Sequence, residues 1–171
     1  AYTYNALGEL QAQHDAGGHR IEYEHDGRGR VWRTTTRTPD GTVETQSTVT
    51  YDSAPGGLGK PDRASIGGTY AGWRGQAGRE TSQTLQYAYD AMGRPTVTET
   101  HVAGEVFRAE VVYDALSRTH AVRDATGRWA KTEYSARGFA GAMCESAAFD
   151  ASPTCSDAIS RTRATDAFGN A

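Results

Sequence analysis

Histidine and aspartate stand next to each other twice near the start of the chain, as they do in some metal sites. The pairs are His14-Asp15 and His25-Asp26. A zinc site needs ligands that converge at characteristic spacings. His14, however, lies at the entrance of an expected turn, and His25 occupies a position where the chain elsewhere has tyrosine. We therefore expect structural roles for both histidines, and neither a metal nor another cofactor.

A glycine-rich stretch, GGLGK at 56–60, has part of the pattern of a phosphate-binding loop. That pattern requires a glycine where Ala54 stands, and a serine or threonine to bind magnesium where Pro61 stands. The stretch is therefore expected to be a turn. Most aspartates also fit turn corners, and neither a nucleophile elbow nor a histidine-containing triad is present. The sequence does not predict an enzyme.

Two cysteines, Cys144 and Cys155, enclose a polar segment that contains Pro153. In a secreted protein they would form a disulfide that staples this segment, whereas in a reducing cytoplasm they would remain free thiols. We expect the disulfide, with free thiols as the alternative.

Three tryptophans raise the question of carbohydrate binding, because an exposed indole ring can stack on a sugar. Trp32 and Trp129 follow expected turns and fit cross-strand packing, whereas Trp73 lies in a glycine-rich segment. Trp73 is therefore the candidate glycan contact. A carbohydrate- or cell-surface-binding repeat module is the alternative to a purely structural role.

The composition favours an extended sheet over a compact globule. The chain has 171 residues, 37% of them hydrophobic, a mean hydropathy of -0.66 and 20 glycines, whereas a packed two-layer domain usually contains more apolar residues. The formal net charge is -3, and the basic residues are dispersed. No basic cluster is therefore available to bind nucleic acid, and no apolar run is long enough for a membrane span.

One short phrase recurs along the chain: a tyrosine or related residue, a polar corner and, three residues after the corner, a glycine. The oxygen of the polar residue can accept a backbone N–H in a tight turn, and glycine supplies the positive φ that a hairpin needs. Ser117 replaces glycine in one turn, and an insertion after Asp52 predicts a wider loop. The expected corners are Asn5, Gly8, Asp26, Gly29, Asp52, Gly59, Asp90, Gly93, Asp114, Ser135, Gly138, Asp166 and Gly169.

Segments between the corners have the length and residue types of strands, and no stretch keeps a helical period. The chain is therefore expected to be all-β. Tyrosines two positions apart, such as Tyr87 and Tyr89, share a strand face, so stacked hairpins should form a ladder of rings. We expect strands at 9–14, 30–39, 42–51, 94–102, 105–113 and 118–123, and loop insertions at about 53–63, 67–84 and 143–160. The insertion at 67–84 is expected to be either a long loop or a distorted hairpin.

The phrases YEHDGRGRV at 23–31, YAYDAMGRP at 87–95 and VVYDALSRT at 111–119 resemble the Rhs/YD-repeat family. Its motif is Tyr-Asp, two residues, Gly-Arg and an aliphatic residue, and the resemblance covers essentially the whole chain. It implies consecutive antiparallel β-hairpins in a curved, spiralling sheet that is part of a larger hollow shell. Residues 1–171 would be a single YD-repeat segment, an excerpt of a longer chain.

The same resemblance implies a function. The sheet would be a non-catalytic wall that encapsulates or displays a toxin or effector polypeptide. Such walls occur in Rhs polymorphic toxins, insecticidal toxin complexes and, more distantly, teneurins. Its partners would be flanking YD repeats of the same chain and the enclosed toxin, in a secreted or cell-surface bacterial protein. No aspartate precedes any of the five prolines, so the self-cleaving Asp-Pro motif of some family members is not expected here.

Overall fold

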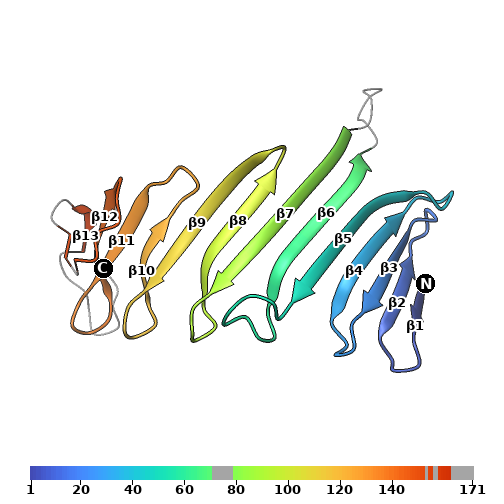
Figure 1. Ribbon diagram of the computed structural model, residues 1–171, viewed down its shortest axis with the longest axis horizontal. Helices are drawn as coiled ribbons and strands as arrows, with labels where there is room; N and C mark the ends of the chain where they lie inside the picture. The colour runs from blue at the N-terminus through green and yellow to red at the C-terminus, as the bar shows by residue number, and fades with distance from the viewer. Residues whose placement is uncertain (71–78, 153, 156–157, 163–171) are drawn as a thin grey trace. The chain divides into compact units, whose positions relative to one another are not determined.

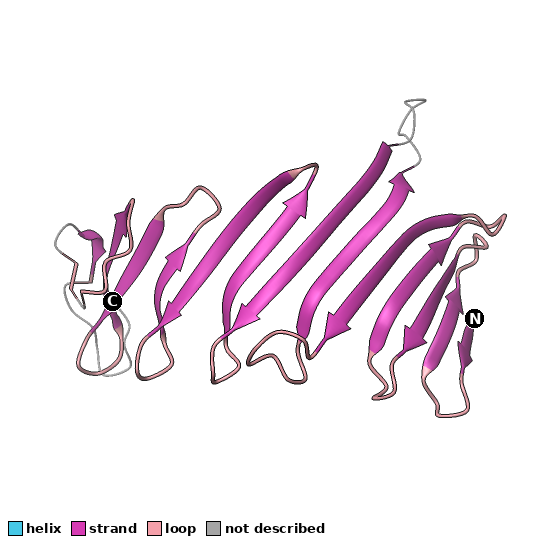
Figure 2. Cartoon of the chain, in the orientation of Figure 1, coloured by secondary structure: helices cyan, strands magenta, loops and turns pink. Residues whose placement is uncertain are grey.

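The structure is a computed structural model that describes residues 1–70, 79–152, 154–155 and 158–162. These residues form thirteen β-strands and no helix, as Figure 2 shows, which confirms the all-β prediction. They include no helix long and apolar enough to cross a membrane. Two compact units are present, one of residues 1–94 with 99–106 and one of residues 95–98 with 107–171.

Each strand of the first unit pairs antiparallel with the next strand in the sequence (Figure 1). Tight turns account for the order from β1 to β5, because two strands joined by a short turn pair with each other. The seven strands are β1 (Tyr2–Tyr4), β2 (Leu10–His14), β3 (Arg20–His25), β4 (Val31–Arg37), β5 (Val43–Tyr51), β6 (Pro61–Tyr70) and β7 (Arg79–Tyr89).

The second unit is also a meander of antiparallel strands, with β9 to β13 paired in sequence order. Residues 99–106, the tip of the segment that contains β8 and β9, group with the first unit, and the remaining residues of β8 and β9 group with the second. The strands are β8 (Pro95–Val102), β9 (Glu105–Tyr113), β10 (Thr119–Arg123), β11 (Trp129–Tyr134), β12 (Ala140–Ser146) and β13 (Ala158–Arg161).

Of the two alternatives expected for 67–84, a long loop and a distorted hairpin, the structure shows a hairpin, because β6 continues to Tyr70, β7 begins at Arg79 and the two strands pair antiparallel. Gly68 explains why the glycine-rich start of this segment is a strand and not a loop. A Cβ atom on Gly68 would lie 2.3 Å from the carbonyl oxygen of Glu44, so the glycine allows β5 and β6 to approach within a strand rather than marking a turn.

The other two expected insertions are shorter than the sequence indicated. β6 already begins at Pro61, inside the loop expected at 53–63. In the segment 143–160, β12 extends to Ser146 and β13 begins at Ala158. That residues 1–171 are a single segment of a longer chain stays a prediction.

The described residues bury few apolar side chains, and no large side chain is fully buried. In the first unit the buried apolar residue is Ala12; in the second they are Ala121, Ala142 and Cys155. Backbone pairing, cross-strand contacts and turn bonds therefore hold each unit together, in place of the thick apolar core of a globular domain.

Candidate functional site

Each repeat turn is closed by the side chain of its polar corner. At Asp26, Oδ1 accepts N–H bonds from Arg28 at 2.8 Å and from Arg30 at 3.0 Å, while the Gly29 N–H donates to the Asp26 carbonyl at 3.0 Å. Gly29 has a φ of 76°, a conformation that costs a residue with a Cβ about 1–2 kcal/mol. A short polar side chain and a glycine therefore both stabilise this turn.

The same bonds recur at other expected corners. The side-chain oxygens of Asn5, Asp90 and Asp114 each accept backbone N–H bonds from the residues two and four positions later. Ser135 accepts only the later bond, from Phe139. The glycines of these turns with positive φ are Gly8, Gly93 and Gly138. The expected corners Asp166 and Gly169 lie outside the described residues.

The turn at Asp52 is a wider loop. Its Oδ1 accepts the Gly59 N–H at 2.6 Å, and its own N–H donates to the Lys60 carbonyl at 3.1 Å. A Cβ atom on Gly56 would lie 2.2 Å from the carbonyl oxygen of Asp90. The loop therefore packs directly against the neighbouring repeat turn, which only a glycine at position 56 permits.

In three turns, an arginine four residues after the aspartate binds that aspartate. In each of them the Nε atom of the arginine donates to the Oδ2 atom of the aspartate. These bonds are Arg30 to Asp26 (2.8 Å), Arg94 to Asp90 (2.6 Å) and Arg118 to Asp114 (2.7 Å). The sequence indicated no contact for these arginines, although Gly-Arg is part of the repeat motif.

At four corners, the tyrosine before the corner binds that turn to the preceding one. Its hydroxyl donates to the carbonyl of the residue that follows the basic residue of the preceding turn. The bonds are Tyr51 to Val31 (2.9 Å), Tyr89 to Pro61 (2.6 Å), Tyr113 to Pro95 (2.9 Å) and Tyr134 to Thr119 (2.7 Å). We call each such contact, together with the preceding basic residue, a tyrosine junction.

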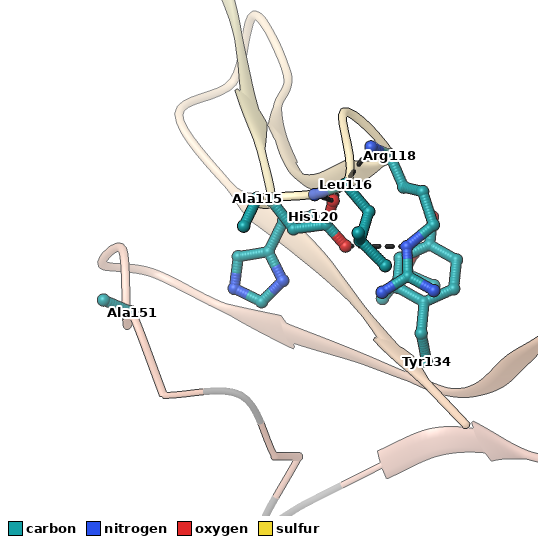
Figure 3. Close-up of a pocket in the computed structure, with 8 residues that line it drawn as sticks. Ala115, Leu116, Arg118, His120, Tyr134 and Ala151 are labelled. Carbon is teal, nitrogen blue, oxygen red and sulfur yellow. Dashed lines mark hydrogen bonds and ion pairs between the residues drawn. The ribbon is translucent and has the colours of Figure 1, made fainter. Parts of the chain in front are cut away.

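In three junctions the basic residue also lies over the tyrosine ring. The Arg30 guanidinium is 4.2 Å from the centroid of Tyr51, the Lys60 ammonium is 5.9 Å from that of Tyr89, and the Arg118 guanidinium is 4.1 Å from that of Tyr134. Figure 3 shows Arg118 against the Tyr134 ring. A cation is attracted to the electron-rich face of an aromatic ring, so the junctions combine this attraction with a hydrogen bond.

The expected ladder of stacked rings does not form at these positions. The tyrosines of the junctions contact cations and carbonyl groups instead. The aromatic pair found in the described residues is Trp129 with Phe149, whose centroids lie 4.9 Å apart. The prediction was wrong because it rested only on which rings share a strand face. It did not include the basic residue of the preceding turn, which lies over the tyrosine ring.

Arg30 joins two turns electrostatically. Its guanidinium donates to both carboxylate oxygens of Asp52, at 3.1 and 2.8 Å, besides binding Asp26. The side-chain hydrogen bond from Arg30 and the hydrogen bond from the Gly59 N–H lower the pKa of Asp52 from 3.8 to about 2. The side-chain hydrogen bond from Arg30 also lowers the pKa of Asp26. Asp52 therefore stays ionised in the folded chain down to about pH 2, and the pKa of Asp26 lies below its ordinary value.

One junction has different chemistry. Glu9 stands where the four tyrosine junctions have arginine or lysine, and His25 stands where they have tyrosine. The Asn5 Nδ2 donates to Glu9 Oε2 at 2.5 Å, and His25 Nδ1 lies 3.9 Å from the same oxygen. Both positions of this junction therefore differ from those of the others, since a carboxylate replaces the cation and an imidazole replaces the phenol.

A second fastening holds the loop between β12 and β13. Cys144 and Cys155 form a disulfide. Lys131, only 6% exposed, donates from Nζ to Asp150 Oδ2 at 2.9 Å and to the carbonyls of Ser152 and Thr154 at 3.0 and 2.9 Å. The buried ammonium therefore has three acceptors, as a charge in such a position requires. No sequence pattern had indicated it.

The charged side chains that line the pocket of Figure 3 already bind other groups of the chain. The pocket measures about 410 Å³ and is lined by Asp114, Arg118, His120 and Tyr134, among others. Asp114 and Arg118 bind each other, and Arg118 also covers Tyr134. The charged groups lining this pocket are thus engaged in a turn and a junction.

Other sequence candidates do not gather into a site. In the part of the chain that the structure describes, no group of three or more His, Cys, Asp or Glu side chains is placed to hold a metal ion. His14-Asp15 and His25-Asp26 lie at separate turns. The candidate glycan contact, Trp73, lies outside the described residues, so carbohydrate binding stays a prediction.

Comparison with protein families identifies residues 4–43 as similar to the family described as RHS Repeat. This segment runs from β1 to the start of β5 and includes the Glu9–His25 junction. No curated protein matches the sequence.

Among solved structures, the chain is similar to the Tc holotoxin pore of Photorhabdus luminescens, with 13% identity and a TM-score of 0.36, over 84% of this chain and 11% of that one. It is also similar to a complex of TcdB2, TccC3 and Cdc42, with 17% identity and a TM-score of 0.36, over 84% and 10% of the chains. A TcdB2-TccC3 structure without the hypervariable C-terminal region gives 17% identity, a TM-score of 0.38 and the same coverage. This chain spans about a tenth of the chains it matches.

Proposed function

We propose that this chain, whose residues 4–43 match the family described as RHS Repeat, belongs to the Rhs/YD-repeat family and is a non-catalytic wall segment of a β-sheet shell. The shell encloses or displays a toxin or effector polypeptide of a secreted bacterial toxin. Flanking repeats of the same polypeptide continue the wall. The repeats thus serve as a container, and the chemistry of intoxication belongs to the enclosed polypeptide.

One observation carries this proposal: consecutive repeat turns are fastened to each other by the same junction. Tyr51 and Tyr89 do so in the first unit, and Tyr113 and Tyr134 in the second. A contact that recurs from turn to turn suits a sheet of indefinite length, because each added hairpin brings the donor for the previous one. A self-contained domain would not need it.

The sparse core supports the same role. The first unit buries Ala12 as its apolar residue, and the second buries Ala121, Ala142 and Cys155. A domain that acts alone normally covers one face of its sheet with a second layer. A wall segment instead leaves its faces to the shell interior and exterior, and its edge strands to neighbouring repeats.

Protease protection tests the proposal in the full polypeptide that carries these repeats. The intact wall should shield the enclosed polypeptide, whereas Tyr51→Ala combined with Tyr89→Ala should loosen two junctions and raise the rate at which that polypeptide is cleaved. Val106→Ala, at an exposed position of β9, serves as the control and should leave protection intact. Equal cleavage of the enclosed polypeptide in all three proteins would overturn encapsulation.

A further inference from the structure

Tyr4 occupies the position of a junction tyrosine but has no junction in the described chain. It directly precedes the corner Asn5, as Tyr51 precedes Asp52 and Tyr89 precedes Asp90. Its side chain makes no hydrogen bond with the described residues, and the residue is 60% exposed. It lies at the end of β1, which pairs with β2 on one side.

The outer edge of β1 also presents free backbone groups. Ala1 and His14 exchange two backbone bonds of 2.8 Å, and pairing alternates along an antiparallel ladder. The N–H groups of Tyr2 and Tyr4 therefore point away from β2. Such an edge can accept another strand through main-chain hydrogen bonds alone.

The remaining junctions show which side chain such a strand must bring. Arginine or lysine faces tyrosine in the contacts of Arg30, Lys60 and Arg118. Where the basic residue is replaced by Glu9, the tyrosine is replaced by His25. A carboxylate is repelled by the electron-rich face of a phenol ring, which gives a physical reason for the joint change.

We propose that β1 and Tyr4 form a docking edge for a β-hairpin whose turn ends in Gly-Arg or Gly-Lys, and that this edge discriminates against a turn ending in Gly-Glu. The arriving strand pairs with β1, its basic residue lies over the Tyr4 ring, and the carbonyl of the next residue accepts the Tyr4 hydroxyl. This inference rests on the proposed wall function, since the occupant is another repeat hairpin, and it adds a rule for which repeat can precede which.

The chain itself supplies a hairpin of the right spacing for a test. Tyr113 follows Pro95 by 18 residues. Fusing a second copy of residues 86–109 directly before Ala1 places Tyr4 at the same distance from the added Pro95. The added copy contains the turn of Asp90 and Arg94, and the 171-residue chain remains intact behind it.

A matched control changes only the chemistry of the added turn. Asp90→Asn with Arg94→Glu, both in the added copy, reproduces the Asn5–Glu9 turn that the chain already uses, so the altered hairpin retains a turn known to form. Adding Tyr4→His to this control recreates the pairing of Glu9 with His25. Tyr4→His in the chain without the fusion shows whether that substitution has any effect of its own.

Hydrogen exchange of the Tyr2 and Tyr4 amides reads out docking. The fusion with arginine should slow their exchange by about tenfold or more relative to the unfused chain. The Asn and Glu version should give much less protection, and Tyr4→His should restore it. Equal protection with arginine and with glutamate, or no restoration by histidine, would overturn the discrimination while leaving sheet extension and the wall function intact.

Failure of every fused hairpin to dock would contradict the proposed function itself. If none of the fused hairpins slows exchange at β1, the edge does not accept a repeat hairpin, and both the docking edge and the continuation of the wall are wrong. Far-ultraviolet circular dichroism of each fusion confirms that the added residues gain strand content, so that an unfolded insert is recognised as failed docking.

Discussion

The hydroxyl of Tyr89, at the end of β7, donates a hydrogen bond of 2.6 Å to the carbonyl of Pro61 at the start of β6. The two residues are 28 positions apart, so this bond fastens the turn at Asp90 to the loop that begins at Asp52. Burial, with contributions from the nearby Tyr87 and Asp62, raises the pKa of the Tyr89 phenol. The hydroxyl therefore stays protonated and able to donate in neutral solution.

Tyr89→Phe should lower the free energy of unfolding by about 1 kcal/mol, the usual net value of a hydrogen bond of this kind. The ring and its contact with Lys60 are retained, so the loss reports the hydroxyl. Chemical denaturation measures it. Tyr4→Phe is the matched control, because the Tyr4 hydroxyl makes no bond in the described chain, and it should change stability little. Equal effects of the two substitutions would contradict the junction.

Ser117→Gly should stabilise the second unit. Ser117 has a φ of 63°, where a residue with a Cβ is strained, whereas glycine adopts this conformation freely but gains entropy in the unfolded chain. The net effect of Ser117→Gly is an increase of about 0.5–1 kcal/mol in the free energy of unfolding. Gly8→Ser provides the reverse test, since Gly8 has a φ of 81° and open space around it. A thermal midpoint that falls in Ser117→Gly would contradict this account.

Local chemistry made the fold predictable. The bonds that close a turn, such as those from Arg28 and Arg30 to Asp26, span two to four residues, so the polar corner and the glycine reveal them in the sequence. The expected strand 105–113 agrees with β9. The long-loop alternative at 67–84 was wrong because a glycine can serve close strand packing as well as a turn, and only the neighbouring Glu44 distinguishes the two.

The junctions were less accessible, because they depend on which strands become neighbours. Tyr134 and Thr119 are 15 residues apart, and Tyr89 and Pro61 are 28 apart. The sequence showed the tyrosines and the arginines but not their contact, and so indicated a ladder of rings. Lys131 was not recognised at all, since its acceptors include two backbone carbonyls, which carry no residue-specific signal.

Acid should destabilise the first unit through Asp52. The folded pKa of about 2 lies below the ordinary value of 3.8, so the unfolded chain takes up a proton first. The contribution of Asp52 is therefore present above about pH 4 and is lost as the pH falls toward 2. Denaturation at several pH values should show a shallower loss over this range in Asp52→Asn than in the unchanged chain.

Glu105→Gln is the control for this measurement, because Glu105 forms no ion pair with the described residues. Its pH dependence should parallel that of the unchanged chain. If Asp52→Asn has the same slope as Glu105→Gln, the pairing of Asp52 with Arg30 does not contribute to acid stability.

Lys131 and the Cys144–Cys155 disulfide restrain the same loop, so their contributions should depend on each other. Lys131→Met removes the ammonium from three acceptors and should cost about 1–3 kcal/mol in the oxidised chain. After reduction the loop is free to leave Lys131, so the same substitution should cost less, as expected for groups that share one structural element. Denaturant midpoints with and without reductant measure this coupling.

Lys60→Met is the control. Because Lys60 lies in the other unit, this substitution should have the same effect on stability with and without reductant. A cost of Lys131→Met that is unchanged by reduction would mean that the ammonium holds the loop without help from the disulfide.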